Sequence, residues 1–539
     1  MPDAPTTTTP TGTENHAQPS AWAERLTEGL RTIPSVWASE RGVAEAQGRR
    51  DLPPSATGPV LALGGALAAL LLVLAGRYGY HRDELYFLAA GRHLAWGYPD
   101  QPPLVPFLAR VLAPAHSVAL LRAPSALAAG AIVILGGLTT RELGGGRSAQ
   151  ILAAAALAGG AVVAGTGHLL STATFDFLAW AVLVLLVLRI LRTGDDRLWL
   201  VAGVVAGVGL LDSDLVAFLM AAIVVGVLIG GPREIFRSPL LWVGGAIAAV
   251  VWSPYLIWQA THGWPQLVVS RSIATGHSGS STPRWLVLPE QLVLLSPWVA
   301  PILVAGLVRL FHDRALRWAR SVGIAYVTLA VIFVVTGGKA YYLAGMFPVL
   351  VAAGAEPTIR WVRRGRWRAR QSLLIAGLVL SAAGSVLLTL PVVPVSDLHK
   401  TSVQYDVGET VGWPTFVAEI AAAYRRIPVP SGGTVAILGS NYGESGAVDR
   451  FGAPYGLPRA YGVHMGYWYW GPPPPSATSV LAIGFDRGQL ARFCNAPVLL
   501  THLDNHVGVH NDEQGAPVWS CVGLRAPWKT LWPRMRDLG

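Results

Sequence analysis

Residues 78–107 read YGYHRDELYFLAAGRHLAWGYPDQPPLVPF and directly follow an apolar run. This stretch places four ionisable residues side by side, from His81 to Glu84, at the point where the apolar run ends. Two apolar-periodic pieces follow at residues 85–94 and 104–112, among several Tyr and Trp residues. The pattern predicts amphipathic helices that lie in the lipid headgroup layer and form the floor of a site at the membrane surface.

The composition of the chain is that of an integral membrane protein. Of its 539 residues, 52% are hydrophobic and 13% are charged, whereas a soluble domain has about 25% charged residues. Apolar runs close to the roughly 17 to 25 residues that span a bilayer predict about eleven transmembrane helices. Two runs are short for a full span, and a break or tilt near residues 212–214 is an alternative. The runs cover residues 59–76, 118–138, 149–165, 173–191, 198–211, 215–230, 240–258, 286–310, 322–336, 341–355 and 372–390.

The positive charge is concentrated in every second loop between these runs. The formal net charge is +10 and the pI is near 9.8. Arginine-rich short loops mark the cytoplasmic side of a membrane protein, so the charge indicates orientation and not a nucleic-acid partner. The chain is therefore predicted to cross the cytoplasmic (plasma) membrane many times, with its N-terminus inside. The arginine-rich loops lie at residues 141–147, 189–197, 233–237, 309–320 and 360–370.

Three regions of different texture predict the domain organisation. Residues 1–55 have no helical periodicity and are expected to form a disordered cytoplasmic tail. Residues 56–392 hold the apolar runs of a transmembrane catalytic domain. In residues 393–539, short strand-like runs alternate with helix-compatible stretches, which predicts a small extracytoplasmic α/β domain. Cys494 and Cys521 lie there, where a disulfide is permitted, but two unpaired buried thiols are the alternative, because spacing does not settle pairing.

Further ionisable residues fall on the predicted outer side of the membrane. They are Asp100, Asp176, His262 and Lys339. Ionisable groups at span ends are candidates for function. A carboxylate can take a proton from a hydroxyl nucleophile, and a Lys ammonium can neutralise a phosphate leaving group. The alternative for Asp83 and Glu84 is that they only cap the helix that follows. The alternative for Lys339 is that a lysine stands at this position by chance and has no function.

Several blocks in a fixed order carry a family resemblance. HRDELYFLAAGRHLAWGYPDQPPL, FDFLAWA, SPYLIWQATHGWP, GGKAYYLAGMFPVLVAAGA, NYGESGAVDRFG and WYWGPPP resemble the bacterial branch of the GT-C membrane glycosyltransferases. That group (glycosyltransferase family 39-like) is similar to protein O-mannosyltransferases and lipid A aminoarabinose transferases. The resemblance covers most of the chain from Tyr78 onward. It implies a polytopic GT-C fold of about eleven transmembrane helices, with juxtamembrane helices in the first outer loop.

The resemblance also implies a reaction and its partners. Such enzymes transfer a sugar from a polyprenyl-phosphate donor to an acceptor hydroxyl on the outer face of the membrane, usually with inversion. The acceptor is a glycan, a lipid or a protein, and membrane lipids surround the enzyme. Inverting transfer needs one base and a stabilised leaving phosphate.

Site roles are carried over residue by residue. Asp83 is implied to be the acceptor-activating base, and Glu84 the catalytic neighbour that shapes or backs it. Lys339, Tyr341 and Tyr342 match the region that holds the lipid phosphate. The candidate substrate-binding residues are His81, Arg82, Asp100, Asp176 and His262.

Some points remain open in the sequence. The sequence identifies no certain cofactor, and a divalent metal near Asp83, Glu84 and His81 is an alternative that no spacing demands. Relatives often carry a basic residue where this chain has Asp212 and Asp214 in LLDSDLVAF, which puts a donor-phosphate clamp on that helix in doubt.

The C-terminal blocks each have a structural alternative. Glu444 and Asp449 in NYGESGAVDRFG could bind an acceptor glycan, or could cap and turn the α/β domain. The aromatic residues of YGVHMGYWYWGPPPP suit sugar stacking, but membrane-interface anchors have the same composition.

Two other classes of protein compete with the transferase. A transporter or lipid flippase predicts charged residues near the bilayer midplane and two related halves. Asp212 and Asp214 are the one feature that fits this class, and no two halves look alike. A membrane scaffold with an outer interaction domain would explain the α/β domain but not the acidic loop.

Overall fold

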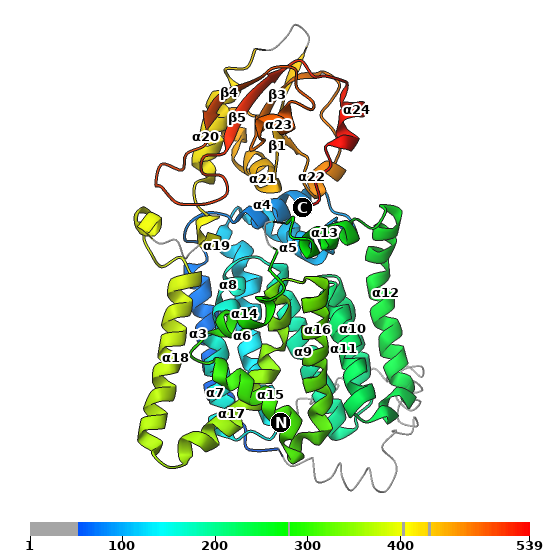
Figure 1. Cartoon of the computed structure of the whole chain (residues 1–539), viewed down its shortest axis with the longest axis vertical. Coiled ribbons are helices and arrows are strands. Elements are labelled where there is room, and N and C mark those ends of the chain that lie inside the picture. The colour runs from blue at the N-terminus through cyan, green and yellow to red at the C-terminus, as the bar shows by residue number, and fades with distance from the viewer. Residues whose placement is uncertain (1–51, 279–280, 401–404, 429–432) are drawn as a thin grey trace, which may run out of the picture.

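The computed structural model describes residues 52–278, 281–400, 405–428 and 433–539. Most of the predicted cytoplasmic tail, residues 1–55, lies outside these ranges. The described chain has two parts, a bundle of helices and an α/β domain that caps one end of it (Figure 1). We call the capped end the upper end of the bundle, as Figure 1 draws it.

Each of the eleven predicted apolar runs is helical. Among the described residues, seven helices are long and apolar enough to cross a membrane, and two bent pairs raise the number to nine. The bent pairs are α7–α8, with an angle of 55°, and α14–α15, with an angle of 118°. The remaining two, α10 and α11, have 13 and 16 residues. The structure thus confirms a multi-pass apolar bundle, while the count of eleven spans stays a prediction.

The bundle helices are α3 (Thr57–Leu74), α6 (Val118–Glu142), α7 (Arg147–Ala158), α8 (Ala161–His168), α9 (Thr172–Thr193), α10 (Leu198–Leu210), α11 (Leu215–Gly230), α12 (Pro239–Thr261), α14 (Val287–Leu295), α15 (Ala300–His312), α16 (Arg320–Thr336), α17 (Phe347–Arg363) and α18 (Trp367–Thr389). Short 3-10 segments join them at η1 (Ala113–Ala115), η2 (Arg233–Arg237), η3 (Arg314–Ala319) and η4 (Ala340–Met346).

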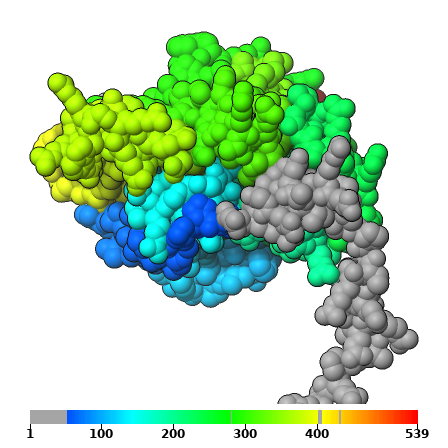
Figure 2. Space-filling view, turned by 90° about the horizontal axis from the view of Figure 1, so that it is seen from below, coloured from blue at the N-terminus to red at the C-terminus, as the bar shows by residue number. Residues whose placement is uncertain are grey.

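Small residues bring the bundle helices together. A Cβ added at Gly306 of α15 would lie 1.8 Å from the carbonyl oxygen of Leu350 in α17, and one at Gly354 would lie 1.8 Å from the Ile302 carbonyl oxygen. Membrane helices pack through such close backbone approach because burial of apolar surface does not drive them together in lipid. By contrast, α18 stands at one edge of the bundle seen from below (Figure 2). Only 11% of its most apolar stretch of 18 residues is buried.

Two helices lie between the bundle and the α/β domain, α4 (Arg82–Arg92) and α5 (Leu104–Leu112), with α13 (Pro265–Ala274) beside them (Figure 1). The exposed Phe107 and Val111 give α5 the apolar face of an amphipathic helix. Both helices lie where juxtamembrane helices were predicted, but α4 exposes no amphipathic face, because every residue from Glu84 to Gly91 is buried. The α/β domain covers the face of α4 that would otherwise be exposed.

The α/β domain is built on a five-stranded sheet. Its strands are β1 (Thr434–Gly439), β2 (Ala460–Gly462), β3 (Ala477–Ile483), β4 (Pro497–His502) and β5 (Pro517–Val522). The order is β2-β1-β3-β5-β4. β1 pairs in parallel with β2 and β3, and β5 pairs antiparallel with β3 and β4. The helices of this part are α19 (Tyr405–Gly408), α20 (Trp413–Tyr424), α21 (Tyr442–Phe451), α22 (Gly466–Tyr469), α23 (Arg487–Leu490) and α24 (Trp528–Leu531), with η5 (Val395–Lys400), η6 (Ala453–Tyr455) and η7 (Trp532–Arg534).

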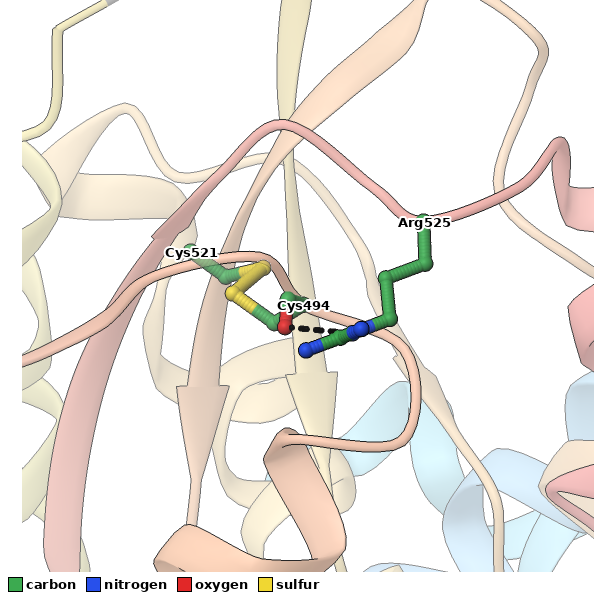
Figure 3. The surroundings of a disulfide bond; sticks show 3 residues. All are labelled: Cys494, Cys521 and Arg525. Atoms are coloured by element: carbon green, nitrogen blue, oxygen red, sulfur yellow. Dashed lines mark hydrogen bonds between the residues drawn. A yellow bond between two sulfur atoms is a disulfide. The ribbon is translucent and has the colours of Figure 1, made fainter.

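The two cysteines of the α/β domain form a disulfide. Cys494 and Cys521 are joined with their Cα atoms 5.8 Å apart (Figure 3). The Arg525 Nε donates a hydrogen bond of 3.1 Å to the Cys494 carbonyl oxygen. The disulfide links the segment after α23 to β5. Of the two alternatives that the sequence left open, the cysteines are therefore paired and are not free thiols.

We expect loss of this disulfide to destabilise the α/β domain by about 3 kcal/mol, because it closes a loop of 27 residues in the unfolded chain. The measurement is urea unfolding of the purified protein, followed by the fluorescence of the tryptophans in this domain, for the parent and for Cys494→Ser/Cys521→Ser. A midpoint that is the same in both proteins would contradict the expectation.

Candidate active site

The Asp83 carboxylate lies at the start of α4, facing the α/β domain. Its side chain is 42% exposed, and the Tyr442 hydroxyl donates a hydrogen bond of 2.8 Å to Oδ1. Burial raises the pKa of the Asp83 carboxyl, while the charges of His81 and Arg82 lower it. The Tyr442 hydrogen bond and the Lys339 ammonium lower it further, so the pKa lies below its usual value. Asp83 is therefore an accessible carboxylate that is ionised at neutral pH.

Glu84 has a different role from its neighbour. Its carboxylate and the Arg122 guanidinium form a fully buried bidentate pair, with Nε to Oε1 and Nη2 to Oε2 each 2.8 Å. The backbone N–H groups of Leu170 and His81 also donate to it, at 3.0 and 2.8 Å. Burial raises the pKa of the Glu84 carboxyl, but the Arg122 charge and the hydrogen bonds from Arg122, His81 and Leu170 together lower it below its usual value. Glu84 positions α4 on the bundle and has no oxygen left free for a substrate.

Arg122 connects this pair to the end of the first span. Its guanidinium donates to the carbonyl oxygens of Ala75 and Gly79, at 3.0 and 2.8 Å. The ion pair thus holds together the chain after α3, the start of α6 and the start of α4. The N-terminal turn of α4, which carries Asp83, is set by these contacts and by the capping box of His81 with Glu84.

Asp100 lies within electrostatic range of Asp83. Its Oδ1 accepts a hydrogen bond of 2.8 Å from the Tyr86 hydroxyl, which itself accepts one of 3.1 Å from the backbone N–H of Gly466. Burial raises the pKa of Asp100 to about 6, and the neighbouring Asp83 charge adds to the rise. The Lys339 ammonium acts on both carboxyls, so these three groups share one electrostatic environment.

Lys339 opens η4 directly above α17 and is half-buried. Among the described residues, no carboxylate lies within ion-pair distance of its ammonium. The nitrogen lies 5.8 Å from the ring centroid of Tyr341, and the Tyr341 and Tyr342 rings meet edge to face at 5.1 Å. A cation that is near two carboxylates without being paired to either can bind an additional anion.

A second group of carboxylates lies at the upper end of the bundle. The Asp176 side chain, in the first turns of α9, is buried and accepts no hydrogen bond from the described residues, with Ser213 and Trp180 nearby. Asp212, also buried, lies in the turn between α10 and α11 within electrostatic range of Asp176. The N–H of Leu104 in α5 donates to the Leu211 carbonyl oxygen at 2.8 Å. This turn therefore lies directly below α5, at the upper end of the bundle. A transporter would instead place such charged residues at the middle of the bundle.

His262 is separate from these groups. It follows α12, and its ring stacks on Trp258 with centroids 4.1 Å apart and lies 6.0 Å from the Tyr469 ring. In the described ranges, no hydrogen bond or ion pair joins His262 to Asp83, Asp100 or Lys339. The structure gathers Asp83, Asp100, Lys339 and Arg82, while His262 lies outside this group.

The α/β domain supplies a residue that the sequence analysis missed. Helix α21 packs on α4 through glycines, because a Cβ at Gly446 would lie 2.9 Å from the Leu85 Cβ and one at Gly443 would lie 2.9 Å from the Arg82 Cβ. This close approach brings Tyr442 to Asp83, 359 positions away in the chain. Arg82 also forms an ion pair with Asp512 of the α/β domain. A local pattern can predict α21, but no sequence signal reveals a contact over this separation.

Three other polar residues of the NYGESGAVDRFG segment have structural roles. Asn441 and Glu444 form a capping box at the start of α21, and Asp449 accepts hydrogen bonds from the Ala460 N–H and the Tyr467 hydroxyl, at 3.0 and 3.1 Å. Of the two alternatives for Glu444 and Asp449, the contacts favour the cap and turn.

Two buried glutamates lie where the α/β domain meets Arg82. Glu409 and Glu513 each accept one hydrogen bond, from the Asp512 N–H at 2.8 Å and from the Asn441 side chain at 3.0 Å. Burial raises the pKa of both to about 8, aided by the Glu513 charge for Glu409 and by the Glu444 charge for Glu513. Both side chains are therefore largely protonated at neutral pH.

We expect the α/β domain to lose stability as the pH rises from about 4.3 to about 8. The folded-state pKa of about 8 for Glu409 and Glu513 lies above the unfolded value of about 4.3. The stabilisation is complete below the unfolded pKa and is lost as the pH passes the folded pKa. Thermal unfolding followed by tryptophan fluorescence should show this slope, and Glu513→Gln should flatten it. The matched control is Glu419→Gln; an unchanged slope in Glu513→Gln would contradict the assignment.

The predicted metal ligands do not offer a metal site as they are placed. Glu84 is held by Arg122, and the His81 Nδ1 accepts a hydrogen bond of 3.2 Å from the Asp83 N–H. Among the described residues, no group of three or more His, Cys, Asp or Glu side chains is arranged to hold a metal ion. We therefore derive no step through a metal.

Comparison with known proteins gives a family match over part of the chain and a similarity of fold. Residues 100–258 match the family model described as dolichyl-phosphate-mannose-protein mannosyltransferase. No curated protein matches the sequence. Among solved structures, ArnT from Cupriavidus metallidurans bound to undecaprenyl phosphate is similar at 14% identity, with 85% of this chain and 97% of that chain covered and a TM-score of 0.56.

Two further solved structures are more distant. AglB from Archaeoglobus fulgidus shows 13% identity, covers 73% of this chain and 63% of that chain, and has a TM-score of 0.44. The arabinofuranosyltransferase AftD from Mycobacteria shows 14% identity, covers 86% of this chain and 40% of that chain, and has a TM-score of 0.49.

The family match and the shared fold confirm the resemblance that the ordered sequence blocks predicted, and they do not favour a transporter. They agree with the prediction of a glycosyltransferase. The chain is a multi-pass membrane protein of the GT-C glycosyltransferase fold, and its residues 100–258 match the family of the dolichyl-phosphate-mannose-protein mannosyltransferases.

Proposed function

We propose that this protein transfers a sugar from a polyprenyl-phosphate donor to an acceptor hydroxyl on the outer face of the cytoplasmic membrane, by inverting displacement. The observation that carries the proposal is the pairing of an accessible, ionised Asp83 with a Lys339 ammonium that has no carboxylate within ion-pair distance among the described residues. The family match at residues 100–258 supports the donor class.

The two groups divide the reaction between them. Asp83 accepts the proton of the acceptor hydroxyl as the acceptor oxygen forms its bond to the anomeric carbon. The bond from that carbon to the phosphate oxygen breaks, and the polyprenyl phosphate leaves with the electron pair. Lys339 stabilises the charge that develops on the leaving phosphate. A single base is enough for inversion, which agrees with the unavailability of Glu84.

The other predicted residues take supporting roles in this proposal. Asp100, with a pKa of about 6, lines the site beside Asp83 and binds sugar hydroxyls, while the Tyr442 hydroxyl orients the Asp83 carboxylate. Tyr341 and Tyr342 flank Lys339 on the phosphate side. The N-terminus lies in the cytoplasm and the α/β domain outside, which places a glycan, lipid or protein acceptor within reach of Asp83.

The test is turnover of a panel of polyprenyl-phosphate sugars by the purified protein in lipid nanodiscs. We expect one donor to be transferred, or slowly hydrolysed, and Lys339→Gln to raise its KM at least about tenfold, since a charge-assisted phosphate contact contributes about 1.5–3 kcal/mol. Lys529→Gln, an exposed lysine in α24, is the matched control. A folded parent protein that neither binds nor turns over any donor would contradict the proposal, as would equal KM values for the two variants.

A further inference from the structure

A pocket of about 200 Å³ lies on the opposite side of α4 from Asp83. The α4 residues that line it are Leu88 and Arg92. At about 100° of helix turn per residue, Arg92 lies on the opposite face from Asp83. The other walls come from the end of α5, the start of α6 and helix α21 of the α/β domain.

Three arginines gather around this pocket. The Arg450 guanidinium stacks over the Tyr80 ring at 5.3 Å and donates to its hydroxyl at 3.3 Å. Arg92 lies 3.8 Å from the Asp449 carboxylate. Arg110 is exposed, and in the described ranges no carboxylate lies within ion-pair distance of it. Of these three arginines, only Arg92 lies within ion-pair distance of Asp449, so the guanidinium groups leave the pocket with excess positive charge.

Asp449 offsets the charge of Arg92 only. Its side chain is only 9% exposed, and its oxygens already accept hydrogen bonds from the Ala460 N–H and the Tyr467 hydroxyl. His116, which also lines the pocket, adds a further nitrogen donor at its mouth. Guanidinium groups suit phosphate oxygens because they present several donors in a planar fork.

The remaining wall of the pocket is apolar and lies at the level where the spans begin. Leu112, Pro114 and Leu121 line it, and Leu121 is in the first turn of α6, a helix long enough to cross a membrane. Outside the pocket, Phe107 and Val111 of α5 and Leu120 of α6 are 51%, 58% and 44% exposed. The pocket thus has a cationic part against α4 and α21 and a route along apolar side chains into the bilayer.

We propose that this pocket binds the phosphate group of an anionic membrane lipid whose acyl chains lie along α5 and α6. The arginines hold the phosphate and the apolar wall receives the glycerol and the first acyl carbons. The bound lipid would contact α4, α6 and α21 together and so stabilise the packing of the α/β domain on the helix bundle. The proposal does not depend on the transfer reaction, because none of the residues that contact the Asp83 carboxylate lines the pocket.

The test is native mass spectrometry of the full-length protein titrated with dioleoyl phosphatidylglycerol, dioleoyl phosphatidylcholine or inorganic phosphate. We expect phosphatidylglycerol to bind more tightly than phosphatidylcholine, and its affinity to fall about fivefold in Arg110→Gln and about 25-fold in Arg110→Gln/Arg450→Gln. The matched control is Arg284→Gln/Arg492→Gln, two exposed arginines elsewhere.

The arms of the titration separate the sources of phosphate. Binding of inorganic phosphate that Arg110→Gln weakens, without binding of phosphatidylglycerol, would overturn the lipid proposal and identify a soluble phosphate ligand instead. Phosphatidylglycerol affinities that are equal in the parent, the pocket variants and the control would overturn the proposal. Arg110→Gln alone keeps the test valid if the double variant is unstable, because the Arg110 side chain is exposed.

Discussion

Asp83→Asn is expected to reduce sugar transfer by about 10²- to 10⁴-fold, the usual contribution of a general base. The amide cannot accept the proton of the acceptor hydroxyl, but it has nearly the same shape and keeps an oxygen for the Tyr442 hydroxyl. Donor affinity should therefore change little, because the proposed mechanism assigns the donor phosphate to Lys339 and not to Asp83. The measurements are the transfer rate at saturating donor and the equilibrium binding of the same donor.

Two companion variants make this result specific. Tyr442→Phe keeps the Asp83 carboxylate and removes only its hydrogen bond, so we expect a much smaller loss than in Asp83→Asn. Asp504→Asn changes an exposed carboxylate of the α/β domain and should transfer at the parent rate. If Asp83→Asn turns over the donor as fast as the parent, the Asp83 carboxylate is only part of a helix cap and the base is another group.

The second large effect is expected from the buried ion pair of Glu84 and Arg122. Glu84→Gln leaves the Arg122 guanidinium charged and fully buried without its partner, which typically costs about 3–5 kcal/mol. We expect the unfolding midpoint in detergent to fall accordingly. Glu84→Gln combined with Arg122→Met should lose less than the sum of the two single variants, because the double variant leaves no unpaired charge.

A more exposed pair provides the control for this prediction. Arg189 bonds Glu142 at 2.9 Å with its own side chain 42% exposed, and Arg189→Gln should cost less than about 1 kcal/mol. A Glu84→Gln protein with the parent stability but without transfer activity would contradict the positioning role. It would instead make Glu84 a catalytic residue, as the family resemblance implied.

Most of the fold could be predicted because it depends on local patterns. Apolar runs indicate helices in a membrane wherever they occur, so the eleven predicted segments are all helical. The strand-like runs of the α/β domain correspond to β1, β3 and β4 in the same way. The order of the sequence blocks pointed to Asp83, Asp100 and Lys339, and the structure brings these three into one electrostatic environment.

What a local pattern does not contain is which distant segments meet. The pairing of Cys494 with Cys521, the partner of Glu84 on α6, and the position of Tyr442 at Asp83 each depend on how separate elements pack. The glycines of α21 allow it to lie directly on α4, and this docking buries α4, which its own sequence would place at the membrane surface. His262 is an example of a residue that a family block pointed to but that does not lie near Asp83. It follows the end of α12, where its ring lies beside those of Trp258 and Tyr469. The residue types alone therefore indicate the kind of chemistry that the chain can perform. The difference between Asp83 and Glu84 follows from the tertiary contacts, which leave the Asp83 carboxylate accessible and enclose that of Glu84.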